Sequence, residues 1–469
     1  AGESGVCYDA MDAQMACDLV AMAKPVTKWA TRVVDPASLL RVFRRAVKIA
    51  GTPPMGPVFV CLPMDVLDSP CVEDIVATAF PSTRVAPETD AIAAIASMLL
   101  DAATPMIIMG DGVAASKAQA DLALVAELAG ARVYGADNSE VNIDAAHPLY
   151  QGNLGHMFGS HSAPIVGKAD AVLIVGTYVF PEVFPALDSV FQSGAKVAHI
   201  DLNAYEIAKN FPVDLGVVAN PKLTLAALAE QLQMTRTVAQ KSEADRSMAI
   251  CRDEAEAALS RANETDRNAW DAVPMKPARF MQELAARVGD DVVIFDEALT
   301  TSPELNRYLP PRHPGHFFQT RGGSLGVGIP GAIGLKLAFP EKQVIGFTGD
   351  GGSMYTIQAL WTAAKYQIDA KFVVCNNRAY RLLQLNIQQY WRERGIPDHG
   401  FPEPFDLSRP PLRFDAIAES MNVPAVRVEK PSDIGPALDQ ALEIKGPFLI
   451  DLILDGTVAD HYYPCHCGQ

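Results

Sequence analysis

Short apolar segments alternate with amphipathic segments along most of this chain, and this alternation constrains the fold more than any other feature. Runs such as PMIIMG (105–110), AVLIVG (171–176) and QVIGFTG (343–349) are too short for buried helices and contain almost no polar residues. Strands that are apolar on both faces are typical of parallel sheets covered by helices on both sides. The sequence therefore predicts an α/β protein built from doubly wound parallel sheets.

A polar and charge-rich segment interrupts the alternation between residues 233 and 274. We expect it to be a linker that contains an exposed helix. A chain of 469 residues favours about three domains. The predicted units are residues 1–80, 81–232 and 275–469, with the linker at 233–274.

Composition excludes several classes of partner. The net charge of −16 argues against a nucleic-acid partner, because the phosphate backbone would be repelled. No apolar run reaches the roughly 18 residues of a membrane-spanning helix, so no membrane partner is expected. The first residues, AGESGVCYDA, lack the features of a signal peptide. Eight cysteines are too few for a disulfide scaffold, which favours a cytoplasmic location.

Polar and glycine residues follow each apolar strand of the last unit. They are Asp296-Glu297 leading to Thr300, the cluster Gly322–Gly326, the turn Gly349–Gly352, and Asn376-Asn377. The carboxyl ends of parallel strands meet at one edge of a sheet, so these segments should converge on one ligand site.

The turn at Gly349–Gly352 suits a diphosphate. Gly351 and Gly352 allow a close approach to the backbone, and we expect a helix starting at Ser353 to present unpaired N–H groups. Asp350 would repel a phosphate unless a cation lay between them. A carboxylate, the amide oxygen of Asn377, a backbone carbonyl, phosphate oxygens and water would suit Mg²⁺.

A second Gly-Asp-Gly turn, at 110–112, tests how specific this pattern is. Asp350 to Asn377 spans 27 residues (377 − 350), and Asp111 to Asn138 also spans 27 (138 − 111). The second turn lacks a glycine at the following position, an upstream glycine cluster and paired asparagines. We therefore interpret Asp111 as part of a structural turn.

The segment GDGGSMYTIQALWTAAKYQIDAKFVVCNN (349–377) resembles the cofactor motif of thiamine diphosphate-dependent enzymes. RGGSLGVGIPGAIGLKLAF (321–339) and GPVFVCLPMDVLD (56–68) resemble segments of benzoylformate decarboxylase and acetohydroxyacid synthase. The resemblance covers nearly the whole chain. It implies the end of a pyrimidine-binding domain in 1–80, a middle domain in 81–232 and a diphosphate-binding domain in 275–469.

The resemblance also implies an activity: decarboxylation or carboligation of a 2-oxo acid with thiamine diphosphate and Mg²⁺. It implies a homodimer or homotetramer with the cofactor between subunits. The implied metal ligands are Asp350, Asn377 and the carbonyl of Ala379. The implied cofactor contacts are Thr300, Gly323, Ser324, Leu325, Asp350, Gly351, Gly352, Ser353, Asn377, Ala379 and Tyr380.

The chain departs from the family in ways that affect function. The family activates its cofactor with a glutamate near the start of the pyrimidine-binding domain, and the resemblance begins after that region. That glutamate is expected upstream of Ala1 or on another chain; the alternative is a cofactor-binding but non-catalytic relative or subunit. Glu297 is expected to support the Thr300 loop rather than to replace this acid. Tyr380-Arg381 stands where the family often has Tyr-Gly. No flavin fingerprint occurs in residues 87–232.

Four further segments leave alternatives open. His313 and His316 could reach the substrate, although surface positions are commoner, and His156 and His161 could face the site from the middle domain. Residues 381–395 are predicted to form a helix, either lining the substrate pocket or only packing. The tail cluster could bind metal or cover the site, but a non-functional terminus is favoured; it comprises His461, Cys465, His466 and Cys467.

Overall fold

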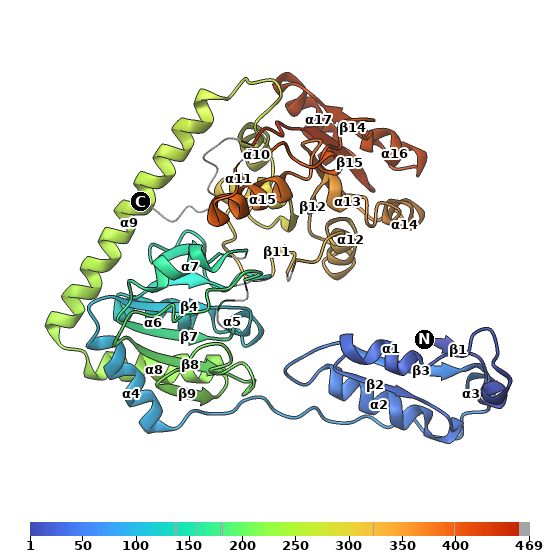
Figure 1. Ribbon diagram of the computed structural model, residues 1–469, viewed down its shortest axis with the longest axis horizontal. Coiled ribbons are helices and arrows are strands. Elements are labelled where there is room, and N and C mark those ends of the chain that lie inside the picture. The colour runs from blue at the N-terminus through green and yellow to red at the C-terminus, as the bar shows by residue number, and fades with distance from the viewer. Residues whose placement is uncertain are drawn as a thin grey trace.

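The computed structural model describes residues 1–458 except 137, 156, 179, 181, 322 and 398, and its strands form three parallel sheets. The predicted fold class is confirmed. The first sheet has the order β1-β3-β2 and is joined to the middle unit by an extended segment at 69–88 (Figure 1). Its strands are β1 (Gly2–Glu3), β2 (Trp29–Arg32) and β3 (Val58–Pro63), with α2 (Leu39–Ala50) between the last two. In the described residues no helix is long and apolar enough to cross a membrane.

The second sheet has six parallel strands in the order β6-β5-β4-β7-β8-β9. Its central strand β7 is buried at every position, as expected for a strand covered on both faces. The strands are β4 (Pro105–Met109), β5 (Arg132–Gly135), β6 (Tyr150–Asn153), β7 (Ala171–Val175), β8 (Lys196–Asp201) and β9 (Leu215–Val218). The helices α4 (Thr89–Leu100), α6 (Gln119–Ala129) and α8 (Pro221–Thr235) pack together on one face.

The third sheet also has six parallel strands, in the order β11-β10-β12-β13-β15-β14. These strands are β10 (Val293–Glu297), β11 (Phe317–Gln319), β12 (Val344–Gly349), β13 (Ala370–Asn376), β14 (Ala425–Val428) and β15 (Phe448–Ile453). Alternate residues pack into two separate cores: Phe347 and Val373 contact α10 (Pro277–Ala285) and α17 (Pro431–Glu443). Phe372 and Val374 pack with α12 (Gly328–Ala338), α14 (Ala359–Lys365) and α16 (Phe414–Ser420). The sheet is therefore doubly wound.

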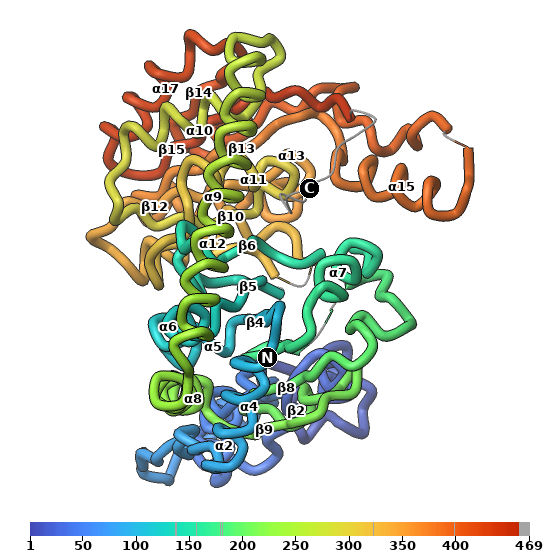
Figure 2. The backbone as a smooth tube through the Cα atoms, turned by 90° about the vertical axis from the view of Figure 1, so that its left-hand side faces the viewer, coloured from blue at the N-terminus to red at the C-terminus, as the bar shows by residue number. Residues whose placement is uncertain are grey.

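One helix, α9 (Val238–Asn268), occupies most of the predicted linker and runs beside both large sheets (Figures 1 and 2). Thr237 and Gln240 form a capping box at its start. Near that end Ser247 Oγ donates to the carbonyl of Gly130, 2.8 Å away. Near the other end Asp266 accepts hydrogen bonds from Arg307 at 2.7 Å and Tyr308 at 2.9 Å. The predicted exposed helix is thus confirmed, and it is fastened to both large units; the predicted domain boundaries stay predictions.

The helix after the turn at Gly349–Gly352 differs from its prediction. We expected one helix starting at Ser353, but a short helix, α13 (Asp350–Ser353), is followed by turns, and α14 starts only at Ala359. The reason lies in Thr356, whose Oγ1 donates to the carbonyl of Gly326 at 2.6 Å. This bond draws the segment toward the neighbouring loop instead of letting a continuous helix form.

The buried carboxylate Asp451 of β15 forms an ion pair with β14 and a hydrogen bond with the end of β13. Asp451 is 0% exposed, and burial raises the pKa of its carboxyl group. It accepts hydrogen bonds from Asn376 Nδ2 at 2.9 Å and from the guanidinium of Arg427 at 3.0 Å. The side-chain amide of Asn376 is therefore engaged in a hydrogen bond within the sheet.

Replacing Arg427 with Met should lower the free energy of unfolding by about 3–5 kcal/mol, because Asp451 would stay buried without its cation. Urea unfolding at neutral pH measures the change. The control is Lys196→Met: its ion pair with Asp214 is 65% and 44% exposed, so the loss should be below about 1 kcal/mol. Equal losses in the two variants would contradict this account.

Candidate functional site

The carboxyl ends of β10, β12 and β13 lie side by side, as expected from the sequence. Glu297 at the end of β10 pairs with Thr348 of β12, and Gly349 of β12 pairs with Cys375 of β13. The turns that follow these strands, including the predicted Asp350 and Asn377, therefore start from one edge of the sheet.

Asp350 is a buried carboxylate held by backbone N–H groups. Its residue is 3% exposed, and burial raises the pKa of its carboxyl group to about 7. Gly351 N donates to Oδ1 at 2.8 Å, and Arg378 N donates to Oδ2 at 2.6 Å. Among the described residues, none of its hydrogen bonds or ion pairs involves a cationic side chain. A cation bound here would relieve the cost of burying this charge.

The turn after β13 brings further predicted residues to Asp350. Asn377 Oδ1 accepts a hydrogen bond from Ala379 N at 3.0 Å. The Tyr380 ring lies against the backbone of Gly351, where an added Cβ would come within 2.3 Å of its Cε1. Only glycine fits at 351 in this arrangement, so close packing explains this position.

Glu297 has a different role from the one predicted. Its two carboxylate oxygens accept hydrogen bonds from Gly326 N and Gly328 N, and Thr348 Oγ1 donates to it at 3.3 Å. Glu297 therefore fixes the glycine loop before α12, and the prediction that it supports the Thr300 loop is wrong. Asp296 takes that role, because its Oδ1 accepts from Ala298 N at 2.8 Å and Ser302 Oγ at 2.9 Å.

The loop at 323–326 is shaped by glycine. Gly323 and Gly326 have φ values of +70° and +85°, which favour glycine. Thr320 Oγ1 donates to the carbonyl of Ser324 at 2.5 Å, and Leu325 stays 39% exposed. The remaining glycine of the predicted cluster, Gly322, lies outside the described residues. The described part of this loop thus exposes the apolar side chain of Leu325 next to the hydrogen bond between Thr320 and Ser324.

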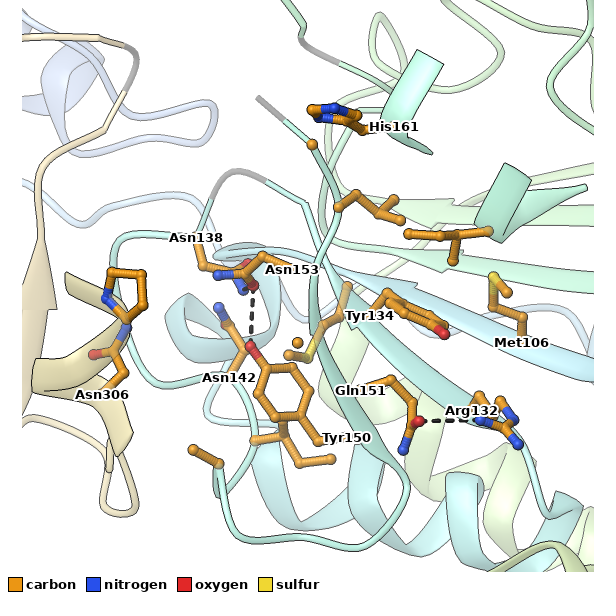
Figure 3. Close-up of a pocket in the computed structure, with 18 of the residues that line it drawn as sticks. Met106, Arg132, Tyr134, Asn138, Asn142, Tyr150, Gln151, Asn153, His161 and Asn306 are labelled. Carbon is orange, nitrogen blue, oxygen red and sulfur yellow. Dashed lines mark hydrogen bonds between the residues drawn. The ribbon is translucent and has the colours of Figure 1, made fainter. Parts of the chain in front are cut away.

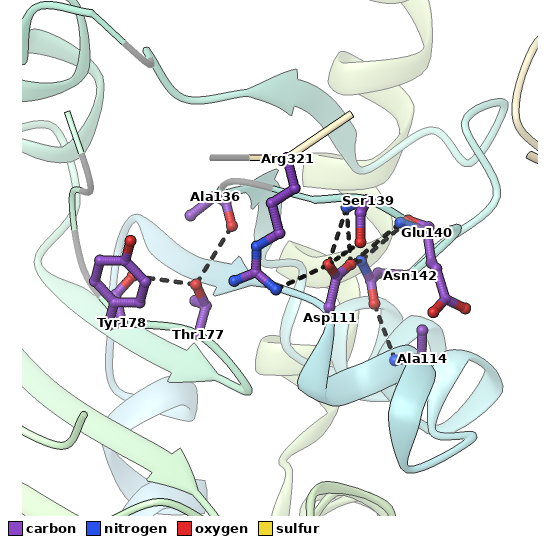
Figure 4. Close-up of polar contacts among 9 residues, drawn as sticks. All are labelled: Asp111, Ala114, Ala136, Ser139, Glu140, Asn142, Thr177, Tyr178 and Arg321. Atoms are coloured by element: carbon purple, nitrogen blue, oxygen red, sulfur yellow. Dashed lines mark hydrogen bonds and ion pairs between the residues drawn. The ribbon is translucent and has the colours of Figure 1, made fainter. Parts of the chain in front are cut away.

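The turn at Asp111 is fully occupied by contacts within the protein (Figure 4). Its carboxylate accepts from the N–H and hydroxyl of Ser139, from Glu140 N and from Asn142 Nδ2. Asp111 also forms an ion pair with Arg321 at 3.2 Å. Among the described residues, Asp111 has cationic and N–H partners, whereas the hydrogen bonds of Asp350 come from N–H groups, and this supports the structural interpretation of Asp111.

A cavity of about 1520 Å³ opens between the middle unit, α9 and the third unit. Figure 3 shows its middle-unit wall, where Tyr150 contacts Asn153 and Arg132 contacts Gln151, with Asn306 facing them. The cavity is lined by four predicted site residues, namely Thr300, Gly323, Ser324 and Leu325. It is not lined by the other seven, which are Asp350, Gly351, Gly352, Ser353, Asn377, Ala379 and Tyr380. The cavity therefore meets the predicted site along one side only.

The histidines that were candidates for substrate contact lie in different parts of the structure. His316 precedes β11, at the amino ends of the strands, so it lies at the sheet edge opposite the site. His313 makes an edge-to-face contact with it, with ring centroids 5.8 Å apart. His161 lines the cavity and contacts Gln389 of α15 (Arg381–Arg394) at 3.0 Å, which confirms the helix predicted there. His156 and the tail residues His461, Cys465, His466 and Cys467 lie outside the described residues.

Comparison with known proteins identifies the family. Residues 300–452 match the family description "Thiamine pyrophosphate enzyme, C-terminal TPP binding domain", and residues 92–228 match its central domain. The chain belongs to the thiamine pyrophosphate-dependent enzyme family. The predicted resemblance is therefore confirmed.

Relatives within this family cover nearly the whole chain. A probable acetolactate synthase large subunit from Methanococcus aeolicus is 28% identical over 96% of this chain and 75% of its own length. Benzoylformate decarboxylase from Pseudomonas aeruginosa is 27% identical over 92% of this chain and 76% of its own. The structure of a 4-hydroxybenzoylformate decarboxylase from Rhodococcus jostii RHA1 shares the fold, with a TM-score of 0.80 and 24% identity. That match covers 97% of this chain and 81% of the other.

Sequence reasoning did not identify Asp296 as the support of the Thr300 turn, nor Arg321 as a partner of Asp111. Asp296 offered a usable pattern, since an aspartate two residues before a turn often accepts its N–H groups. Arg321 offered none, because its partner is 210 residues away in the chain.

Replacing Asp296 with Asn should remove a pH-dependent loss of stability. Burial raises the pKa of Asp296 from 3.8 to about 6, so the folded protein holds this proton more tightly than the unfolded chain. The contribution of this group to stability is therefore largest below about pH 4 and falls as pH rises to about 6. Wild type should lose about 1.4 kcal/mol relative to the variant for each pKa unit between these values. Urea unfolding from pH 4 to pH 7 measures the difference, and parallel profiles would contradict it.

Replacing Glu297 with Gln should destabilise the glycine loop. The amide can accept from one of the two N–H groups, and its own NH₂ would face the other. We expect a loss of about 1–3 kcal/mol in the free energy of unfolding. Glu256→Gln on the exposed face of α9 is the control and should change little. A loss no larger than that of the control would show that the loop does not depend on this carboxylate.

Proposed function

We propose that this chain is a thiamine diphosphate- and Mg²⁺-dependent enzyme that decarboxylates a 2-oxo acid or transfers the resulting acyl unit to a second carbonyl. The observation that carries the proposal is Asp350, a buried carboxylate with a raised pKa and no cationic side chain among its described contacts. It lies in the segment that matches the cofactor-binding domain of the family.

The residues around Asp350 fit a bound Mg²⁺. Asp350 and Asn377 would supply side-chain oxygens, and Ala379 would supply its carbonyl. No group of three or more His, Cys, Asp or Glu side chains is placed to hold a metal in the described part of the chain. The remaining ligands would therefore come from phosphate and water, which is usual for Mg²⁺.

The neighbouring turns would bind the rest of the cofactor. Gly351, Gly352, Ser353 and Thr300 would contact the diphosphate, and Gly323, Ser324 and Leu325 would contact the ring system. When bound, thiamine diphosphate supplies a positively charged ring that accepts the electrons released as CO₂ leaves. Glu297 would hold the glycine loop in place, and the apolar side chain of Leu325 would orient the ring and exclude water.

We also propose that a second copy of the chain covers this site, as a homodimer or a dimer of dimers. Large apolar side chains near the site are exposed, including Leu325 at 39%, Tyr355 at 64% and Trp361 at 53%. An exposed apolar patch of this kind often marks an interface. A cytoplasmic location is supported by the cysteines in the described residues, which are all free thiols.

Calorimetric titration of the protein with thiamine diphosphate in the presence of Mg²⁺ tests the site. Asp350→Ala should abolish Mg²⁺-dependent binding, because the metal loses its only carboxylate ligand, while Asp214→Asn in the middle unit should bind like wild type. Unchanged affinity in Asp350→Ala would contradict the assignment of Asp350 to the cofactor site.

A second measurement on the same preparations separates an enzyme from a cofactor-binding protein. Release of CO₂ from a panel of 2-oxo acids, assayed with the full-length natural chain, supports the enzyme. Tight cofactor binding without CO₂ release or acyl transfer from any acid would contradict the proposed enzyme activity and support the alternative of a cofactor-binding but non-catalytic relative.

A further inference from the structure

We propose that Asp111 and Arg321 act together as positioning residues that hold the loop residues Thr320, Arg321 and 323–326 against the middle unit, and that this contact tunes cofactor affinity. We call the contact the Asp111 clasp; it comprises Asp111, Ser139, Glu140, Asn142 and Arg321. The inference about affinity rests on the proposed function, whereas the clasp itself rests on the geometry alone.

The first part of the clasp fixes a segment within the middle unit. Asp111 accepts from Ser139 N at 3.0 Å, Ser139 Oγ at 2.5 Å and Glu140 N at 3.2 Å. Asn142 Nδ2 donates to it at 3.1 Å, and Asn142 Oδ1 accepts from Ala114 N at 2.9 Å. One carboxylate thus determines the path of residues 139–142.

This segment then pairs with the third unit. Gln319 N donates to the carbonyl of Ser139 at 2.9 Å, and Glu140 forms an antiparallel bridge with Phe318. Phe318 and Gln319 belong to β11, the edge strand of the third sheet. The middle unit therefore covers the otherwise open edge of the sheet that carries the cofactor motif.

The clasp closes directly beyond β11. Arg321 follows the strand by two residues, and its guanidinium lies 3.2 Å from Asp111 Oδ2 (Figure 4). Burial, together with the charge of Asp111, raises the pKa of Glu140. Of these two neighbouring carboxylates, Asp111 has the guanidinium of Arg321 as its cationic partner.

The consequence concerns the residues that follow. Gly323, Ser324 and Leu325 lie between two anchors: Arg321 held by the middle unit, and Gly326 held by Glu297. A loop fixed at both ends loses less conformational freedom when a ligand binds. The middle unit can therefore influence cofactor affinity without touching the cofactor.

Arg321→Gln tests the clasp in two measurements, with Arg413→Gln as the matched control. Arg413 forms an exposed ion pair with Asp415 in the same unit, away from the loop. Hydrogen exchange without cofactor should rise over residues 317–327 in Arg321→Gln and not in Arg413→Gln. Unchanged exchange in Arg321→Gln would overturn the clasp.

Calorimetry with thiamine diphosphate and Mg²⁺ tests the effect on affinity. Arg321→Gln should bind about two- to fivefold more weakly, as expected for loss of a partly exposed ion pair, and Arg321→Lys should recover most of the loss. Adding Asp111→Asn to Arg321→Gln should weaken binding by less than the sum of the single effects, because the two residues share one contact. Unchanged affinity in Arg321→Gln, even with lower thermal stability, would reduce the pair to a purely structural contact and overturn the proposal.

The two measurements also separate this proposal from the proposed function. A wild-type protein that bound no cofactor would overturn the function and the tuning of affinity together. The exchange comparison would still decide whether the Asp111 clasp holds the loop.

Discussion

The parallel register of β10, β12 and β13 is the constraint on which the rest of the structure depends. Because these neighbouring strands run in one direction, the chain must leave all three at the same edge of the sheet. The last residues of these three strands are Glu297, Gly349 and Asn376. The common direction of the strands therefore determines at which edge of the sheet the polar residues of the turns lie.

Four carboxylates gather around this sheet, and each is stabilised in a different way. Asp451 has a guanidinium and an amide, Glu297 has two backbone N–H groups and a hydroxyl, and Asp296 has an N–H and a hydroxyl. Burial raises the pKa of Asp350 to about 7, and among the described residues its hydrogen bonds come from backbone N–H groups. Among the described contacts of these four carboxylates, a cationic side chain occurs only at Asp451.

The sequence predicted the central strands well and the edges poorly. β7 is a continuous apolar run and β12, β13 and β15 are mostly apolar, so their burial on both faces could be inferred from the sequence. The short edge strands β6, β9, β11 and β14 were not predicted, because they are only partly buried and lack a long apolar run. The break after Ser353 could not be foreseen either, since it depends on a bond between Thr356 and a loop one strand earlier. The positions of Asp350 and Asn377 followed from local pattern, whereas the roles of Glu297 and Arg321 required tertiary partners.

The helix α9 is fastened at two points, at Ser247 to the middle unit and at Asp266 to the third. An α-helix turns by about 100° for each residue, so the number of residues between these two contacts fixes the angle between them about the helix axis. Inserting or deleting one residue between them would rotate one contact to the wrong side of the helix. The length of this segment is therefore restricted as strictly as the identity of its buried residues, although most of its surface faces solvent.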